Sequence, residues 1–198
     1  MNREFVMEKA HTEYADHIAY ARLTDAVRTG RDYVGHVEGD DKLWSYVRGC
    51  RAEMAFYLWL GGKSVARWID FIVDPTAEQL NFCDMVYRDF KIDVKARPEG
   101  WVDFIVRCKG VKPENVYVLA VTDFYPLIIF HGWMTGEEVA RCRIGGRQAV
   151  PGYVIDFDDP NIKDCIEIKG IKIKIVIDAA KATPDTIEQI ARLLDDAR

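Results

Sequence analysis

Two stretches in the first third of the chain repeat apolar residues at the spacing of an α-helix. Residues 8–30 predict a long amphipathic helix, since polar residues separate the apolar ones. Residues 31–41 carry glycines and several charges, which favours a loop. Residues 43–60 predict a second, more buried helix, and Gly61-Gly62 ends it. The apolar positions of the first helix are Ala15, Ile18, Ala19, Leu23, Ala26 and Val27.

The middle of the chain contains short apolar and aromatic runs that predict β-strands. One run, residues 65–73, has a mixed pattern and ends at Asp74-Pro75. Three further runs are separated by turn residues, so we expect an antiparallel meander. They are residues 82–87, 90–96 and 101–107.

The two most apolar runs predict the centre of a sheet. Residues 116–121 and 127–130 are almost continuously apolar, as expected for strands covered on both faces. After them, Thr135 and Glu138 have the spacing of a capping box, in which each side chain bonds the other residue's backbone. A short helix to about Arg143 is therefore predicted.

The last part of the chain alternates apolar and polar residues before a final helical pattern. Residues 166–177 alternate with a break at Gly170, which predicts a hairpin or a bent strand. Thr183-Pro184 has the form of a helix start, and apolar residues follow at helical spacing. We expect a strand-plus-helix appendage here.

Together these elements predict an α/β fold with a central mixed sheet of four or five strands. The two N-terminal helices are expected on one side and the Thr135 helix on the other. A chain of 198 residues suits one domain with a sizeable core. Within it we expect an N-terminal helical segment, a core and a C-terminal appendage, at residues 1–42, 43–154 and 155–198.

Composition narrows the class of protein. No apolar run approaches the roughly 20 residues of a membrane span, and no leader pattern opens the chain, so we expect a cytoplasmic protein with no membrane partner. The five cysteines lack zinc-ligand and redox spacing, which favours reduced thiols. A formal net charge of −5 argues against non-specific coating of nucleic acid but leaves room for a local basic groove.

Asp93-Val94-Lys95 combines an acid and a lysine on one face of a predicted strand. Taken alone, this tripeptide also fits an ordinary half-exposed strand. Asp84 adds weight, because Phe82, Cys83, Met85 and Val86 surround it in the sequence. A carboxylate in such surroundings costs free energy unless it is paired, hydrogen-bonded or bound to a metal.

Glu53 is a second anomalous carboxylate, since it is the only charge in residues 52–60. Its helical neighbours are mainly apolar or aromatic. It could form a salt bridge to a buried arginine or reach past the helix edge to water. One metal site shared with Asp84 would satisfy both carboxylates.

This set of residue types favours phosphodiester hydrolysis over acyl or glycosyl chemistry. Clustered carboxylate oxygens suit Mg²⁺ or Mn²⁺, which keep waters while binding one or two carboxylates and substrate phosphate. Such an ion activates water and neutralises phosphoryl charge. Lys95 supplies a compact positive charge that could orient the water or stabilise the transition state.

These residues and their order resemble the PD-(D/E)XK nuclease superfamily, the restriction-endonuclease-like fold, and its small phage and archaeal members in particular. The resemblance spans about residues 47–154. Asp84 matches the first acid, Asp93 and Lys95 match the acid and lysine of the (D/E)XK element, and Glu53 matches the helical acid of many members. Cys83 departs from the proline that usually precedes the first acid.

The resemblance implies a restriction-endonuclease-like core and a Mg²⁺- or Mn²⁺-dependent deoxyribonuclease. Asp84 and Asp93 would hold the metal, Glu53 would complete its shell directly or through water, and Lys95 would assist the attacking water. An endonuclease or a junction- or structure-specific enzyme is favoured over an exonuclease. The rival readings are a non-catalytic nucleic-acid-binding or assembly module, and a structural protein whose buried carboxylates pair with arginines.

Several basic residues could contact DNA near this site. Arg48, Arg51 and Arg97 are candidates, although a solvated helix face or a local acid partner explains the first two about as well. A second basic cluster contains Arg141, Arg143 and Arg147, and His131 could be a general base or a packed structural histidine. A homodimer would suit symmetric DNA and would give an acidic chain a composite basic groove.

Overall fold

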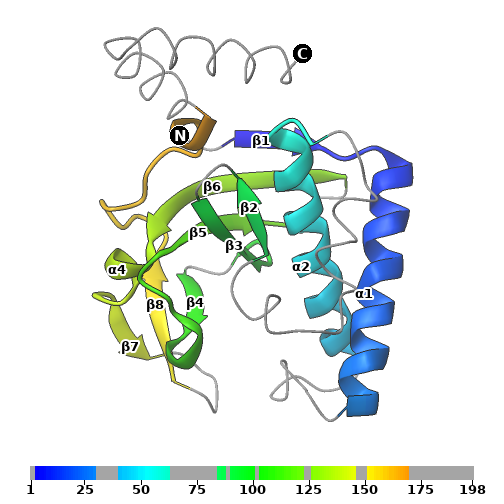
Figure 1. Ribbon diagram of the computed structural model, residues 1–198, viewed down its shortest axis with the longest axis horizontal. Coiled ribbons are helices and arrows are strands. Elements are labelled where there is room, and N and C mark those ends of the chain that lie inside the picture. Colours follow the sequence, from blue (N-terminus) through cyan, green and yellow to red (C-terminus); the bar gives the residue numbers. More distant parts are fainter. Residues whose placement is uncertain are drawn as a thin grey trace, which may run out of the picture. The chain divides into compact units, whose positions relative to one another are not determined.

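The protein is a mixed α/β structure in which a curled mixed sheet is flanked by helices (Figure 1). The computed structural model describes residues 3–29, 40–62, 84–87, 90–100, 103–122, 126–145 and 151–169. The chain forms two compact units, Met1–Asp164 and Cys165–Arg198. None of the helices in these described ranges has an apolar stretch suited to crossing a membrane.

The two predicted N-terminal helices are confirmed as α1 (Lys9–Thr29) and α2 (Asp40–Trp59). Helix α2 packs on three strands of the sheet, and α1 packs on α2, so both lie on one side as expected (Figure 1). Gly61 ends α2 with a φ of 97°, which a residue with a side chain rarely adopts. Of the predicted loop at residues 31–41, residues 31–39 lie outside the described residues, and the prediction is wrong for Asp40 and Asp41, because α2 already begins there.

The main sheet has five strands, at the upper end of the predicted number, in the order β1-β6-β5-β3-β2. The β3–β5 pair is parallel and the other pairs are antiparallel. Strand β5 is central, as predicted, and all of its residues are buried. The N-terminal strand β1 was not predicted. The strands are β1 (Arg3–Val6), β2 (Met85–Tyr87), β3 (Phe90–Arg97), β5 (Asn115–Val121) and β6 (Leu127–Thr135).

The predicted meander is confirmed for β2 and β3 but is wrong for the third strand. Strand β4 (Asp103–Arg107) pairs with β8 (Gly152–Asp156), and β7 (Arg143–Gly145) pairs with the other edge of β8. The physical reason is that β5 takes the second edge of β3, from Lys91↔Asn115 to Arg97↔Val121. Strand β4 must therefore find its partner in a second, three-stranded sheet.

The two sheets of the first unit share a hydrophobic core. Tyr117, Leu119 and Val121 point from one face of β5 into a cluster that also contains Phe104 and Ile155 from the second sheet. Alternate residues of a strand point to opposite faces, so every second position of β5 contributes to this cluster. The central strand therefore fixes the position of the smaller sheet.

The predicted capping box is present at the start of α4 (Gly136–Val139). The Thr135 hydroxyl accepts from the Glu138 amide at 3.2 Å, and the Thr135 amide donates to Glu138 Oε2 at 2.8 Å. The predicted extent to about Arg143 is wrong, because the chain from that residue pairs with β8 as β7. Helix α4 is thus a single turn.

The C-terminal strand prediction is also wrong over its described part, since residues 166–169 are helical. The Ile168 amide donates to the Cys165 carbonyl at 3.1 Å, a turn that breaks the predicted alternation. The predicted strand at residues 65–73, the remainder of the 166–177 run and the helix from Thr183 lie outside the described residues.

The segment before residue 165 is fastened across β6. The Lys163 amide and carbonyl exchange 2.9 Å hydrogen bonds with Trp133, and the Lys163 ammonium bonds both Glu138 carboxylate oxygens at 2.6 Å. A Cβ on Gly132 would lie 2.2 Å from Ile162 Cγ2, so glycine permits this close approach. Asp164 accepts two hydrogen bonds from Arg3, at 3.0 and 2.8 Å.

Glu138→Gln should lower the free energy of unfolding by about 1–2 kcal/mol at pH 7, because it removes a charge-assisted pair with Lys163. Burial opposes this charge, but Lys163 and Thr135 outweigh it and lower the pKa of Glu138. A carboxyl with a lowered folded pKa contributes stability above its unfolded pKa and loses it as the pH falls. The deficit should therefore vanish below about pH 4.

Urea unfolding of both proteins at several pH values measures this difference. Glu137→Gln is the matched control, because Glu137 is exposed in the same helical turn and only reaches Arg141 at 3.8 Å. A Glu138→Gln deficit that persists unchanged at pH 3 would contradict the assignment.

Candidate active site

Asp84 is fixed where β2 begins, against the neighbouring strand β3. Its backbone amide donates to the Ile92 carbonyl at 2.8 Å, and its carboxylate oxygen Oδ2 accepts from the Val94 amide at 2.6 Å. The side chain therefore takes a backbone donor of β3. The donor residue, Val94, stands between Asp93 and Lys95 in the sequence, so this bond fixes the Asp84 carboxylate beside that part of β3.

Asp93 and Lys95 share one face of β3, as predicted. Their register partners on the parallel strand β5 are Tyr117 and Leu119, which point to the same face. The Lys95 ammonium forms an ion pair with Asp93 and lies 5.9 Å from the centroid of the Tyr117 ring. Lys95 is thus held between a carboxylate and an aromatic ring.

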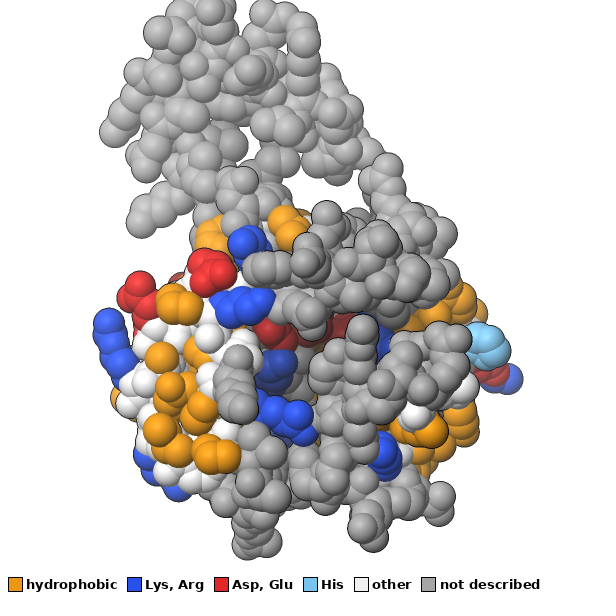
Figure 2. All heavy atoms as spheres, turned by 60° about the horizontal axis from the view of Figure 1, so that its bottom comes forward, with side chains coloured by type: hydrophobic (Ala, Val, Ile, Leu, Met, Phe, Trp, Pro, Cys, Tyr) orange, Lys and Arg blue, Asp and Glu red, His pale blue; other side chains and the backbone are white. Residues whose placement is uncertain are grey.

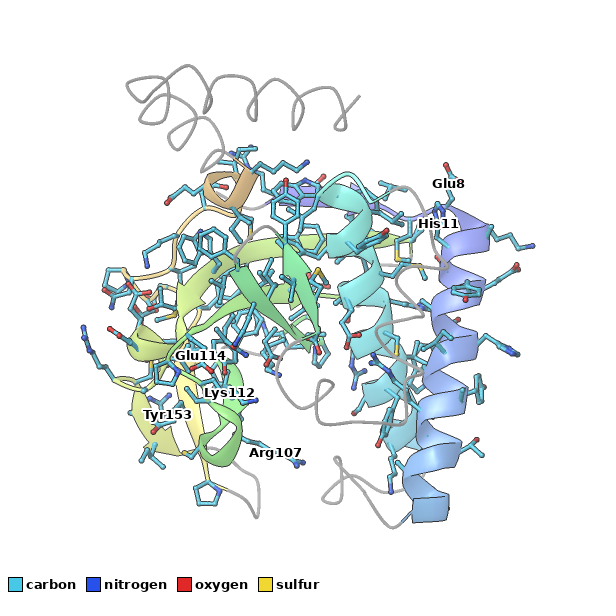
Figure 3. All side chains as sticks on the ribbon, in the orientation of Figure 1. Glu8, His11, Arg107, Lys112, Glu114 and Tyr153 are labelled. Atoms are coloured by element: carbon cyan, nitrogen blue, oxygen red, sulfur yellow. The ribbon has the colours of Figure 1, made fainter. Side chains whose placement is uncertain are left out.

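Tyr117 is a neighbour of this site that sequence reasoning missed. Its ring is buried, and its hydroxyl donates to the Gly110 carbonyl at 3.2 Å while accepting from the Lys112 amide at 2.9 Å. The connection between β4 and β5, where Figure 3 labels Lys112 and Glu114, is tied to the sheet in this way. Tyr117 could not be recognised as a site residue from the sequence, because it lies in an almost continuously apolar strand where one hydroxyl group does not change the pattern.

Glu53 lies on α2 and is buried, with 8% of its side chain exposed. Arg22 of α1 donates to both of its carboxylate oxygens, at 3.0 and 2.8 Å. Of the alternatives for Glu53, the structure therefore has the ion pair with a partly buried arginine. Arg22 also lies 3.3 Å from the Cys50 sulfur.

Sequence reasoning missed Arg22, although its position carried a signal. It lies on the apolar stripe of α1, three or four residues from Ile18, Ala19 and Ala26, which are all buried. A charge on such a stripe needs a buried partner. The anomalous Glu53 on the next helix was that partner.

The three carboxylates act on one another electrostatically. Burial raises the pKa of Asp84 well above its ordinary value, and the charges of Glu53 and Asp93 raise it further. Lys95 and the Val94 amide work in the opposite direction but do not cancel these effects. Asp84 is therefore a carboxylate whose ionisation is opposed by its burial and by two neighbouring negative charges.

Two cations offset part of this negative charge. Burial opposes the charge of Lys95, but Asp93 and Asp84 outweigh it and raise the pKa of this lysine. Arg22 likewise has its pKa raised, since Glu53 foremost and then Cys50 and Asp84 outweigh burial. Burial is the main cause that raises the pKa of Cys50, to about 12, so it is a neutral thiol.

By the chemistry of its side chains the site suits a metal held by two aspartates, and not one held by a complete set of protein ligands. Among the residues the structure describes, no three His, Cys, Asp or Glu side chains are arranged to hold one ion together. Mg²⁺ and Mn²⁺ need only one or two carboxylates, because water and substrate complete their shell. Asp84 and Asp93 meet that requirement, while Glu53 is engaged with Arg22.

The basic residues proposed to contact DNA have different surroundings. Arg51 donates two 2.7 Å hydrogen bonds to Asp16 of α1, and Arg48 lies 3.5 Å from the Ser45 hydroxyl. Arg97 is only 7% exposed, and its guanidinium lies over the rings of two phenylalanines. Of the three, Arg48 has the least engaged side chain in the described contacts.

The remaining polar candidates are engaged elsewhere. His131 is the packed, structural histidine of the two alternatives. Its Nε2 donates to the Phe157 carbonyl at 2.6 Å, and its ring stacks on the Phe157 ring with the two centroids 3.7 Å apart. Arg143 pairs with Asp156 at 2.9 Å, and Arg147 lies outside the described residues. His11 stands in the first turn of α1 beside Glu8 (Figure 3).

The surface view agrees with a mixed-charge region. In Figure 2, Asp and Glu side chains lie among Lys and Arg side chains across the middle of one face. Charges of both signs are therefore neighbours on this face.

Comparison with known proteins adds no relative. No protein-family model, no curated protein and no solved structure matches this chain.

Asp84→Asn should raise the stability of the metal-free protein by about 1–3 kcal/mol at pH 7. A carboxyl whose folded pKa is raised contributes stability below its unfolded pKa and loses it as the pH rises. The ionised Asp84 is thus destabilising, while an asparagine oxygen can still accept from Val94. Chemical unfolding with EDTA, between pH 4 and pH 7, should show the advantage of the variant growing with pH.

Asp93→Asn is the contrasting variant. It removes the ion-pair partner of Lys95, so it should lower stability at neutral pH. An Asp84→Asn protein that is no more stable than the natural one at pH 7 would refute the raised pKa.

Proposed function

We propose that this chain is a Mg²⁺- or Mn²⁺-dependent nuclease that hydrolyses phosphodiester bonds in DNA. One observation carries the proposal. The Asp84 carboxylate accepts from the amide of Val94, the residue between the paired Asp93 and Lys95, and burial first, then Glu53 and Asp93, raise its pKa. A divalent cation would relieve that repulsion, and the lysine beside it suits a phosphoryl substrate.

The order of elements supports a restriction-endonuclease-like core. The helix with Glu53 precedes the antiparallel β2–β3 pair, and β5 then lies parallel to β3. The two aspartates stand at the start of β2 and within β3. This is the order on which the resemblance to the PD-(D/E)XK superfamily depends.

In this proposal each residue of the site has a role. Asp84 and Asp93 would hold the metal, which supplies activated water and neutralises phosphoryl charge. Glu53 would complete the metal's shell directly or through water. The Val94 amide keeps the Asp84 carboxylate against β3, so this ligand is positioned before the metal binds.

Lys95 acts as a donor and not as a base. Its raised pKa keeps it an ammonium at neutral pH, so it has no lone pair with which to take a proton. It can donate to the attacking water or to a phosphoryl oxygen, and Asp93 and the Tyr117 ring orient it. In this proposal Lys95 therefore assists the attacking water by donating a hydrogen bond.

A function without hydrolysis is the second candidate, and the Arg22–Glu53 ion pair favours it. The Arg22–Glu53 pair is bidentate and mostly buried, as in a structural protein or a binding module with no hydrolytic activity. In that reading the carboxylates never share an ion. DNA as partner and a homodimer both remain predictions in either case.

Asp84→Asn and Lys95→Gln should each reduce cleavage by at least about 10²-fold, because one removes a metal ligand and the other the donor. The assay is cleavage of duplex, junction, flap and single-stranded DNA with Mg²⁺ and with Mn²⁺. Asp84→Asn is the more informative variant, since it should be at least as stable as the natural protein. Loss of activity then cannot be attributed to unfolding.

Asp103→Asn is the matched control, because Asp103 is a partly buried aspartate on β4 whose cation is Arg143, at 4.0 Å. It should keep full activity. The absence of Mn²⁺-dependent stabilisation and of cleavage of every substrate would favour the binding module. Undiminished cleavage by Asp84→Asn or Lys95→Gln would refute the mechanism.

A further inference from the structure

The two members of the Arg22–Glu53 ion pair differ in their exposure to solvent. The guanidinium bonds both carboxylate oxygens, yet 28% of the arginine side chain is exposed and only 8% of the glutamate side chain. The arginine is thus the more solvent-accessible member of the pair. It could leave the carboxylate without crossing the core.

A second bidentate pair between the same helices has the opposite arrangement. Arg51 of α2 bonds Asp16 of α1 at 2.7 Å through both oxygens, and here the arginine is the more buried member, at 12% against 30%. The Trp44 ring also lies against this arginine, at 5.8 Å. The α1–α2 interface therefore has a fixed ion pair that lies outside the carboxylate cluster, and Arg22 adds one inside it.

Arg22 also interacts with the cluster beyond its own partner. It bonds both Glu53 oxygens, so a cation that binds this carboxylate has to displace it, and Asp84 adds to the negative charge near Arg22. A guanidinium fork that matches a carboxylate matches a phosphate equally well. The same side chain therefore suits either a carboxylate or a substrate phosphate.

We propose that Arg22 is a displaceable counter-ion of the active site: it holds the Glu53 carboxylate until a divalent cation takes that carboxylate, and it then turns to a substrate phosphate. This assignment rests on the proposed nuclease function. It adds a phosphate-binding residue from α1 to a site whose other members come from α2, β2 and β3. It also makes metal binding and substrate binding mutually supportive, because each frees the partner that the other needs.

Calorimetric titration with Mn²⁺ alone tests the competition. Arg22→Gln should bind Mn²⁺ about tenfold more tightly than the natural protein, since a competing charge is gone. The gain should disappear in the Glu53→Gln background, where no carboxylate remains to be released. Asp16→Asn, which breaks the other α1–α2 ion pair, should bind Mn²⁺ as the natural protein does.

Cleavage of duplex DNA at saturating Mn²⁺ tests whether Arg22 binds a substrate phosphate. Arg22→Gln should lose about 10²-fold in kcat/KM despite its tighter metal binding, and Arg22→Lys should recover only part, because lysine lacks the fork. If Arg22→Gln does not fold, Arg22→Lys replaces it in the titration with a smaller gain in the same direction.

The possible results separate this assignment from the proposed function. Natural protein that binds no Mn²⁺ would overturn both. Natural protein that binds Mn²⁺ while Arg22→Gln matches Asp16→Asn would overturn only the role of Arg22, and so would a gain that persists unchanged with Glu53→Gln. Undiminished cleavage by Arg22→Gln would overturn the phosphate contact.

Discussion

The gathering of several carboxylates around Asp84 is the constraint on which the site depends. Like charges in a partly buried place raise the free energy of the folded state unless cations offset them. The fold supplies two, Lys95 beside Asp93 and Arg22 on Glu53. Three carboxylates against two cations leave an excess of negative charge, which adds to burial in raising the pKa of Asp84.

This electrostatic arrangement depends on the pairing of β3 with β5. The parallel register sets Asp93 and Lys95 on the face that carries Tyr117, and it leaves the other edge of β3 to β2 and Asp84. Because β5 is buried along its whole length, the register is fixed by the core. The acidic cluster is thus built on rigid elements, and among the described contacts Arg22 reaches it from α1.

Much of the fold could be predicted because its signals are local. Both long helices follow from 3.6-residue periodicity, the α4 start from the Thr135 and Glu138 spacing, and β5 from its unbroken apolar run. The partner of β4 could not be predicted, since which edge a strand takes depends on residues far along the chain. The helical turn at residues 166–169 was missed because isoleucines two apart fit a strand equally well.

The site shows the same division between local and distant information. Asp84, Asp93 and Lys95 were suggested by neighbours within a few residues, and the structure puts them in electrostatic contact. The partner of Glu53 lies 31 residues away on another helix, so the position of Arg22 on an apolar stripe signals a buried partner without saying which one. Arg97, proposed for DNA contact from its nearness in sequence to the site, lies instead between the two sheets.

A crystal of the full chain grown with Mn²⁺ and measured at the manganese absorption edge tests the central claim most directly. The account predicts an anomalous peak within about 2.5 Å of carboxylate oxygens of both Asp84 and Asp93. A protein saturated with Mn²⁺ elsewhere, with no peak between these two aspartates, would contradict it.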